Sequence, residues 1–234
     1  MNTALGFWDM YKASVEGKKV IDLFDLTLLL DAMGDEKITD EKYDEMFFHW
    51  AKGVYDFANE KVPELFPKSY KTDFAAENAN AVINVIYDLK ENTGIFDEEN
   101  PSRETFERFA DTYHLSCFKE DGEEVVYLRA GDYREKSSSV HILSVALYFW
   151  KSLFVPMLYY GRFDIIQSSC ARLGIELPAL PQTNHYKEYL MYYYDLCVAI
   201  KSWREEHGLN DAEMCACLYD YAPRFVAATQ EKAE

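Results

Sequence analysis

The feature that most constrains this chain is a helical corner between residues 184 and 221. Gly208 can adopt the left-handed conformation that ends a helix, and Asn210 with Glu213 has the spacing of a capping box for the next helix. Large apolar residues precede the corner at three- and four-residue steps, which places them on one face of a helix. They are Tyr186, Tyr189, Leu190, Tyr193, Cys197, Ile200 and Trp203. The sequence therefore predicts two helices that meet at Gly208 and share a core.

An apolar run from Val140 to Tyr160 is the best candidate for the centre of that core. Its length resembles that of a membrane span, but Lys151 near the middle of a lone span would cost at least about 2.5 kcal/mol. We therefore expect a central helix of a soluble domain, surrounded by the other helices.

Shorter signals predict the remaining helix boundaries. Gly17 is a candidate break between two short helices near the start of the chain, and Thr39 is a good N-cap for a helix that Pro63 and Pro67 end. A further helix is expected to begin at Pro101 with Asn100 as its cap, and Phe163 to Leu173 reads as a short helix.

After Tyr113 the pattern changes to the alternation that is typical of strands. The runs HLSCFK and EVVYLRA flank Asp121 and Gly122, and Asp-Gly between strand-like runs indicates a hairpin. The predicted fold class is mainly α, a multi-helix globular domain with a single β-hairpin. The linker-like segment Ile95 to Ser102 suggests an N-terminal helical lobe, residues 1–97, and a hairpin plus helical core lobe, residues 98–234; one continuous domain is the alternative.

Charge and cysteine content narrow the classes of function. The formal net charge is -17, from 41 acidic and 24 basic residues, so the average surface repels nucleic-acid phosphates and anionic membranes. The five cysteines include no CxxC pair and the N-terminus lacks a signal-peptide pattern, which favours a cytoplasmic protein with reduced thiols. We interpret Cys215 and Cys217 as core residues rather than metal ligands, and expect no metal and no cofactor.

The polar loop before the apolar run is a candidate anion site. It combines basic residues with serines that would lie at a helix N-terminus, where free amide groups attract anions. The residues are Arg129, Arg134, Lys136, Ser137, Ser138 and Ser139. The structural alternative is that the serines cap the helix, while Asp132 and Glu135 neutralise the basic side chains.

Aromatic density suggests a second kind of site. Adjacent residues on a helix point about a hundred degrees apart, so one face cannot bury Tyr192, Tyr193 and Tyr194 together, and some tyrosine should lie at the margin or outside. Amphipathic rings on a rigid helix are favoured at protein interfaces. The candidates for a partner surface are Tyr189, Tyr192, Tyr194 and Trp203. The alternative is that these rings pack between two layers of the domain.

One resemblance extends these expectations. The stretch YYYDLCVAIKSWREEHGLNDAEMCACLYDYAP from Tyr192 to Pro223, with the opening FWDMYKASVEGKKVIDLF, resembles the helical N-terminal region of large bacterial multidomain proteins similar to modification-dependent restriction ATPases. It covers a minor part of the chain and includes no nucleotide-binding motif. The resemblance implies an accessory or targeting module of a longer polypeptide, and it assigns no functional residue.

These observations favour a non-enzymatic protein-interaction or regulatory module, which binds a protein partner or other domains of the same polypeptide through an aromatic, acidic-rimmed helical surface. The alternative is recognition of a small anionic ligand or a flipped nucleic-acid base near Arg134. An enzyme of unknown class is the third hypothesis, since the sequence contains no HExxH, P-loop, GxGxxG or GxSxG motif.

Overall fold

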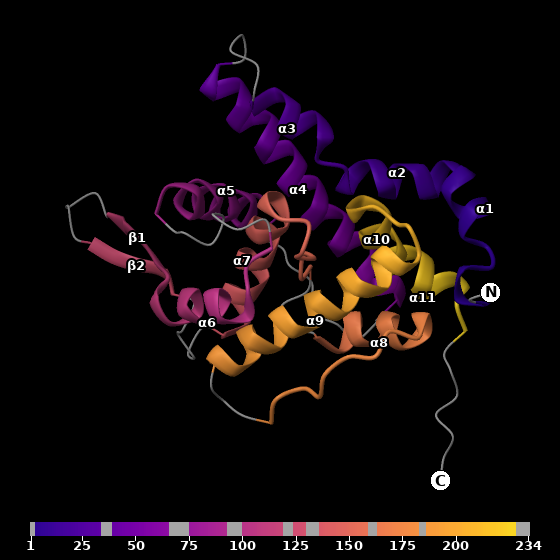
Figure 1. Ribbon diagram of the computed structural model, residues 1–234. Helices are drawn as coiled ribbons and strands as arrows, with labels where there is room; N and C mark the ends of the chain where they lie inside the picture. The colour runs from indigo at the N-terminus through magenta and orange to yellow at the C-terminus, as the bar shows by residue number, and fades with distance from the viewer. Residues whose placement is uncertain are drawn as a thin grey trace.

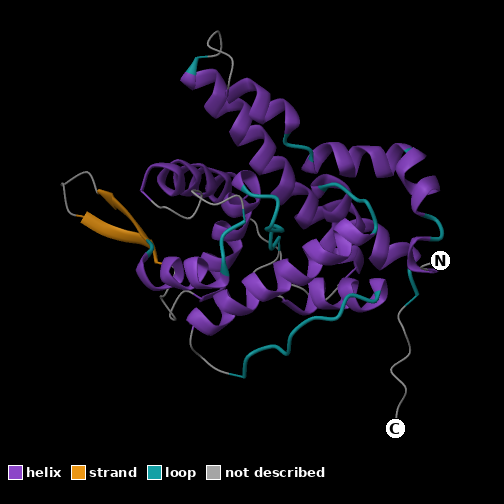
Figure 2. Cartoon of the chain, viewed as in Figure 1, coloured by secondary structure: helices purple, strands orange, loops and turns teal. Residues whose placement is uncertain are grey.

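The chain is mainly helical, as expected, and a computed structural model shows the arrangement of its elements (Figures 1 and 2). The structure describes residues 3–33, 39–65, 75–92, 100–118, 124–129, 136–158, 163–182 and 186–227. The elements before the strands are a 3-10 turn (Thr3–Leu5), α1 (Trp8–Ala13), α2 (Val15–Phe24), α3 (Thr27–Met33), α4 (Asp40–Leu65), α5 (Ala75–Asn92) and α6 (Arg103–Thr112). Those that follow are β1 (His114–Phe118), β2 (Glu124–Arg129), α7 (Lys136–Trp150), α8 (Phe163–Leu173), α9 (Tyr186–Glu206), α10 (Asp211–Ala216), a π-helical turn (Cys217–Tyr221) and α11 (Ala222–Phe225).

The break between the first two helices lies at Ser14, so the expectation of a break at Gly17 was wrong. The Ser14 hydroxyl donates to the Tyr11 carbonyl (2.7 Å) and accepts from the Gly17 amide (2.9 Å), which caps α2. Gly17 lies inside α2, where a Cβ atom would come 2.0 Å from the Tyr11 oxygen. The glycine therefore permits a close approach of two backbones instead of interrupting the helix.

Of two further helix boundaries, one agrees with the expectation and one differs from it. Helix α4 ends at Leu65, between Pro63 and Pro67, as expected from the two prolines. Helix α6 begins two residues later than predicted, since the Ser102 hydroxyl accepts a hydrogen bond from the Thr105 amide (3.1 Å) and takes the capping position. Ser102 therefore takes the capping role that was expected of Asn100.

The two strands pair antiparallel, with His114 opposite Arg129 and Phe118 opposite Glu124. In Figure 1 they extend away from the helices, beyond α6. Residues 119–123, which contain the Asp-Gly pair, lie outside the described residues, so the hairpin turn stays a prediction.

Helix α7 lies at the centre, but it is shorter than the predicted helix. All of its residues from Val140 to Phe149 are buried, and α5 packs along it. The helix ends at Trp150, so the expectation of a helix as far as Tyr160 was wrong. Pro156 has no amide hydrogen, and its ring would clash with the carbonyl oxygen four residues earlier in a helix. Among the described residues, no helix is long and apolar enough to cross a membrane.

The segment after α7, residues 151–158, is a buried non-helical strap. Its residues from Leu153 to Leu158 are buried, so their backbone polar groups require partners inside the protein. Side chains from neighbouring helices supply these partners. The bonds are Tyr193 hydroxyl to Val155 oxygen (2.8 Å), Tyr219 hydroxyl to Pro156 oxygen, His141 Nδ1 to Met157 oxygen (2.6 Å) and Met157 amide to Ser144 Oγ (2.7 Å).

The predicted corner is confirmed. Gly208 has a φ of 67°, the Leu209 amide donates to the Arg204 oxygen (3.1 Å), and Asn210 and Glu213 form both hydrogen bonds of the capping box. The π-helical turn that follows α10 was not expected. It accommodates Pro223, because a wider turn separates the proline ring from the preceding backbone.

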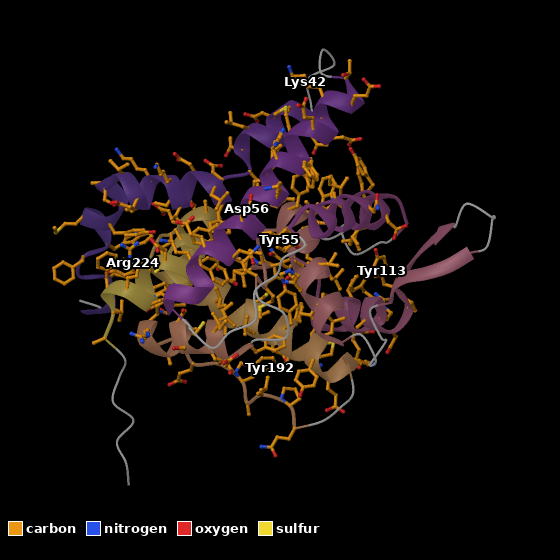
Figure 3. The ribbon with its side chains drawn as sticks, turned by 180° about the vertical axis from the view of Figure 1, so that it is seen from behind. Lys42, Tyr55, Asp56, Tyr113, Tyr192 and Arg224 are labelled. Atoms are coloured by element: carbon orange, nitrogen blue, oxygen red, sulfur yellow. The ribbon has the colours of Figure 1, made fainter. Side chains whose placement is uncertain are left out.

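One hydrophobic cluster includes residues from both sides of the proposed lobe boundary. Helix α2 packs on α10, and α5 packs on α7. Tyr55 of α4 is fully buried in this interior (Figure 3). The boundary itself, between residues 97 and 98, lies outside the described residues.

Candidate binding cleft

The three consecutive tyrosines of α9 are all buried, so the expectation that one of them lies at the margin was wrong. Their exposed fractions are 3%, 0% and 7% for Tyr192, Tyr193 and Tyr194. Helix α9 has neighbours on several sides. Tyr192 accepts a hydrogen bond from Gln167 of α8 (2.6 Å), while Tyr194 donates to the Pro101 oxygen before α6 (2.8 Å). The tyrosines therefore join α9 to different layers of the core.

Of the four partner-surface candidates, three are thus unavailable to a partner in this conformation. Trp203 is buried and stacks on His207, with ring centroids 4.0 Å apart. Tyr189 is half-buried against Phe163 of α8. These rings do not form the exposed aromatic face that the sequence suggested.

The side chains of the candidate anion site lie outside the described part of the chain. Arg134 lies outside the described residues, as do the side chains of Arg129, Lys136, Ser137 and Ser138. The anion-site hypothesis stays a prediction.

Four of the cysteines are core residues. Cys170, Cys197, Cys215 and Cys217 are buried with free thiols, and burial raises the pKa of Cys197 and Cys215 to about 12. At neutral pH these thiols are protonated and are therefore weak nucleophiles. No group of metal-ligating side chains occurs in the described ranges.

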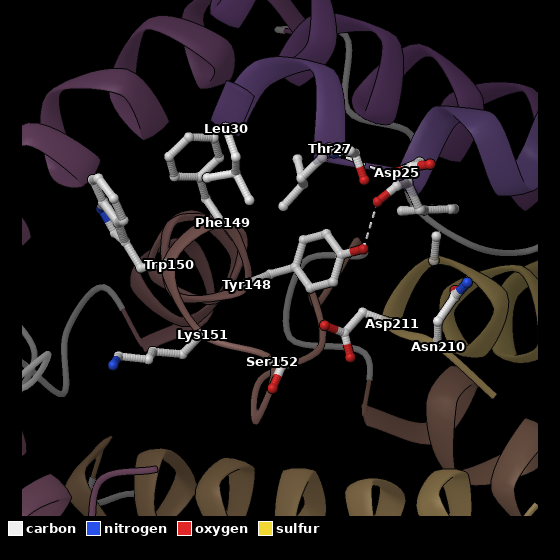
Figure 4. A pocket seen from close by; sticks show the side chains of 13 residues that line it. Asp25, Thr27, Leu30, Tyr148, Phe149, Trp150, Lys151, Ser152, Asn210 and Asp211 are labelled. Atoms are coloured by element: carbon white, nitrogen blue, oxygen red, sulfur yellow. Dashed lines mark hydrogen bonds between the residues drawn. The ribbon is translucent and has the colours of Figure 1, made fainter. Parts of the chain in front are cut away.

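Within the described part of the chain, a cleft of about 450 Å³ lies where four helix ends meet. It lies between the end of α2, the start of α3, the end of α7 and the start of α10 (Figure 4). The lining residues come from three distant parts of the sequence. They are Phe24, Asp25, Leu26, Thr27, Leu30, Tyr148, Phe149, Trp150, Lys151, Ser152, Asn210, Asp211 and Ala212.

One wall of this cleft is apolar. Leu30 of α3 lies beside Phe149 at the end of α7 (Figure 4), and Leu26 and Trp150 also line the cleft. The Trp150 indole is held in place, because its Nε1 donates to the Ile86 oxygen (3.1 Å). Leu30 is 43% exposed, so this wall has apolar surface that the chain itself does not cover.

The other wall carries two carboxylates. Asp25 Oδ1 accepts from the Thr27 amide (2.9 Å), and Asp211 Oδ1 forms an ion pair with Arg204. Arg204 is buried and also donates to the Ser152 oxygen (2.8 Å). In Figure 4 the two aspartates lie above and below the Tyr148 hydroxyl.

Tyr148 joins two of the elements that line the cleft, α2 and α7. Its hydroxyl donates to the Phe24 oxygen (2.6 Å), and burial raises its pKa well above the ordinary value for tyrosine. The hydroxyl is therefore a fixed structural donor at neutral pH. The hydrogen bond holds the end of α2 against α7 beside the cleft.

A second pocket, of about 340 Å³, lies between α6, α9 and the segment 175–182. Its charged side chains pair with one another across the two helices: Arg103 contacts Asp195 (3.0 Å), and Lys187 contacts Glu107 (3.1 Å) and Asp111 (2.8 Å). Both basic side chains of this pocket are engaged in ion pairs, and its volume is smaller than that of the cleft beside Asp25.

Comparison with known proteins gives no match to a family model, to a curated protein or to a solved structure. The resemblance to the N-terminal region of restriction ATPases therefore stays a prediction.

Proposed function

We propose that this chain is a non-enzymatic interaction module that binds a protein partner at the cleft between the α2–α3 junction and the ends of α7 and α10. The observation that carries the proposal is the composition of its walls. Exposed apolar surface at Leu30 lies beside the carboxylates of Asp25 and Asp211. An apolar patch next to polar groups is the usual composition of a protein-binding surface.

The fixed polar groups of the cleft favour binding over catalysis. Asp211 is engaged by Arg204, and the Tyr148 hydroxyl is engaged by the Phe24 oxygen. A general acid or base needs a pKa near the operating pH, whereas the pKa of Tyr148 is shifted away from it. These groups are suited to shape a recognition surface.

The proposal also includes the location of the protein and the kind of partner that it binds. A cytoplasmic setting is supported by the free, buried thiols, which need no oxidising compartment. The partner is either a separate protein or another domain of a longer bacterial polypeptide, for which this region would be the accessory module.

Site-specific cross-linking in cells of the native host tests the proposal. A photoreactive phenylalanine analogue at Leu30 in the cleft is compared with the same analogue at Val198 on α9. The two positions are matched, since their side chains are 43% and 39% exposed. We expect a discrete cross-linked protein from position 30 and none from position 198, with the product identified by mass spectrometry.

Equal labelling from both positions would mean random collisions, and an absence of adducts at position 30 would show that the cleft docks no protein. Either result would refute the proposed function.

A further inference from the structure

The cleft contains acceptor oxygens that the chain does not use. In both Asp25 and Asp211, Oδ1 has a partner while Oδ2 has no hydrogen bond or ion pair among the described residues. Asp25 is exposed, and the side chain of Asp211 is 39% exposed. A carboxylate can accept several hydrogen bonds, so each of these groups can bind a donor from outside.

The charges around the cleft favour a hydrogen-bond donor that is positively charged. The part of the α2–α3 junction that lines the cleft, residues 24–30, contains Asp25 and no basic residue. Arg204 is engaged by Asp211, while Lys151 lies on the opposite side of Tyr148, below Trp150 (Figure 4). The net charge of -17 adds a long-range field that attracts cations.

The apolar wall suits the stem of a basic side chain. Lysine and arginine bury their methylene groups along apolar surface while the charged end reaches a polar group. Leu26 and Leu30 provide such a surface next to Asp25. The Trp150 ring already has a cation as a neighbour, since the Lys90 ammonium lies 5.5 Å from the ring centroid, so the leucines are the surface left for the stem.

We infer that the cleft recognises a basic side chain of the partner, an arginine in particular, whose charged group lies between Asp25 and Asp211 and whose stem lies against Leu30. This inference rests on the proposed function and specifies the chemistry of the partner. The guanidinium group is planar and has five donors, so it can contact two carboxylates at once. Lysine offers three donors from a single point and is expected to bind more weakly.

Three small probes test this chemistry with the full chain. Nα-acetyl-arginine amide is positive, Nα-acetyl-citrulline amide has nearly the same shape without the charge, and Nα-acetyl-glutamate amide is negative. The measurement is the shift of backbone amide signals in NMR spectra during titration with each probe. We expect the arginine probe to shift Thr27, Ser152 and Asp211, which come from three elements around the cleft, and expect the other two probes to leave them unchanged.

A matched pair of variants locates the contact. Asp25→Asn keeps an oxygen that can accept from the Thr27 amide but removes the charge, whereas Asp22→Asn removes an exposed charge from the same helix outside the cleft lining. We expect Asp25→Asn to weaken binding of the arginine probe about two- to fivefold, as for other solvent-accessible ion pairs. Asp22→Asn should leave the affinity unchanged.

Each alternative result has a defined meaning. Binding of the citrulline or glutamate probe at these signals, equal effects of the two variants, or no response to the arginine probe would overturn the inference. If cross-linking from position 30 still identifies a partner in that case, the proposed function stands and only its chemistry is wrong. If the arginine probe does not bind and position 30 gives no cross-linked protein, the proposed function is wrong as well.

Discussion

His141 shows how a single buried residue makes the stability of this chain depend on pH. It is 1% exposed, and its Nδ1 lies 2.6 Å from the Met157 oxygen. Because a carbonyl oxygen can only accept, Nδ1 carries the proton of the neutral ring. The ring of Tyr55 lies beside it, with centroids 4.9 Å apart. Burial lowers the pKa of His141 to about 4.

This shift predicts a loss of stability in mild acid. The unfolded chain binds a proton at His141 near its ordinary pKa of about 6.5, whereas the folded chain does so only near pH 4, so the free energy of unfolding falls as the pH falls between these values. The contribution of His141 to this loss should approach about 3 kcal/mol. Denaturant unfolding of the parent chain and of His141→Asn at pH 7, 5.5 and 4 provides the measurement.

Asparagine retains a donor for the Met157 oxygen but does not titrate, so the stability difference between the two proteins should narrow toward pH 4. Parallel pH profiles would show that His141 is not held neutral by the fold.

At the scale of elements, the strap of residues 151–158 depends on tyrosine hydroxyl groups. Tyr193 of α9 donates to the Val155 oxygen, and Tyr219 of the π-helical turn donates to the Pro156 oxygen. Both rings are essentially buried, so removal of a hydroxyl would leave a carbonyl oxygen unsatisfied in the core.

Tyr193→Phe and Tyr219→Phe should therefore each lower the free energy of unfolding by about 1 to 3 kcal/mol. Tyr87→Phe is the control, since its hydroxyl donates to Asp44 at an exposed position (2.7 Å), and it should change stability by less than about 0.5 kcal/mol. Urea unfolding monitored by circular dichroism measures all three. Equal, small effects would mean that the strap does not need these hydroxyl groups.

The sequence predicted the elements whose signals are local. The capping box joins Asn210 and Glu213, three positions apart, and Gly208 ends α9 as expected. The strap was not predicted, because the apolar run continues through Trp150 and burial alone does not distinguish a helix from an extended segment. The burial of Tyr192 and Tyr194 was missed for a related reason, since it depends on helices that are distant in sequence.

The cleft was beyond prediction for the same physical reason. It combines residues 24–30, 148–152 and 210–212, which no periodicity connects. The sequence contains one local signal near the cleft. An aspartate often accepts a hydrogen bond from the backbone amide two residues later and so forms a turn, as Asp25 does with Thr27. That signal indicates a helix start and gives no reason to expect a binding site.

For the whole molecule, the main feature is the connection between its first and last helices. Tyr11 of α1 donates to Asp220 of the π-helical turn (2.9 Å), and the Tyr221 hydroxyl donates to the Ala4 oxygen (2.9 Å). Asp220 is fully buried and also lies 3.1 Å from Arg224 and 3.7 Å from Lys61 of α4. Figure 1 shows α1 beside α10 and α11.

Asp220→Asn should lower the free energy of unfolding by about 3 to 5 kcal/mol, because the basic side chains around it would lose their buried counter-charge. Asp56→Asn is the matched control, since Asp56 pairs with Lys52 on the exposed side of α4 (Figure 3), and its loss should cost less than about 1 kcal/mol. Thermal and urea unfolding of both variants measure the difference. A loss at Asp220 no larger than that at Asp56 would contradict this account.

The same connection has a consequence for synthesis on the ribosome. Tyr11 and Asp220 are separated by 209 positions, so α1 and α2 leave the ribosome long before the turn that covers them exists. Translation at about 5 to 20 residues per second makes this interval about 10 to 40 s. During that time Trp8, Tyr11 and Phe24 lack part of their native surroundings. We therefore expect this aromatic segment of the nascent chain to be accessible to chaperones until the C-terminal helices emerge and cover it.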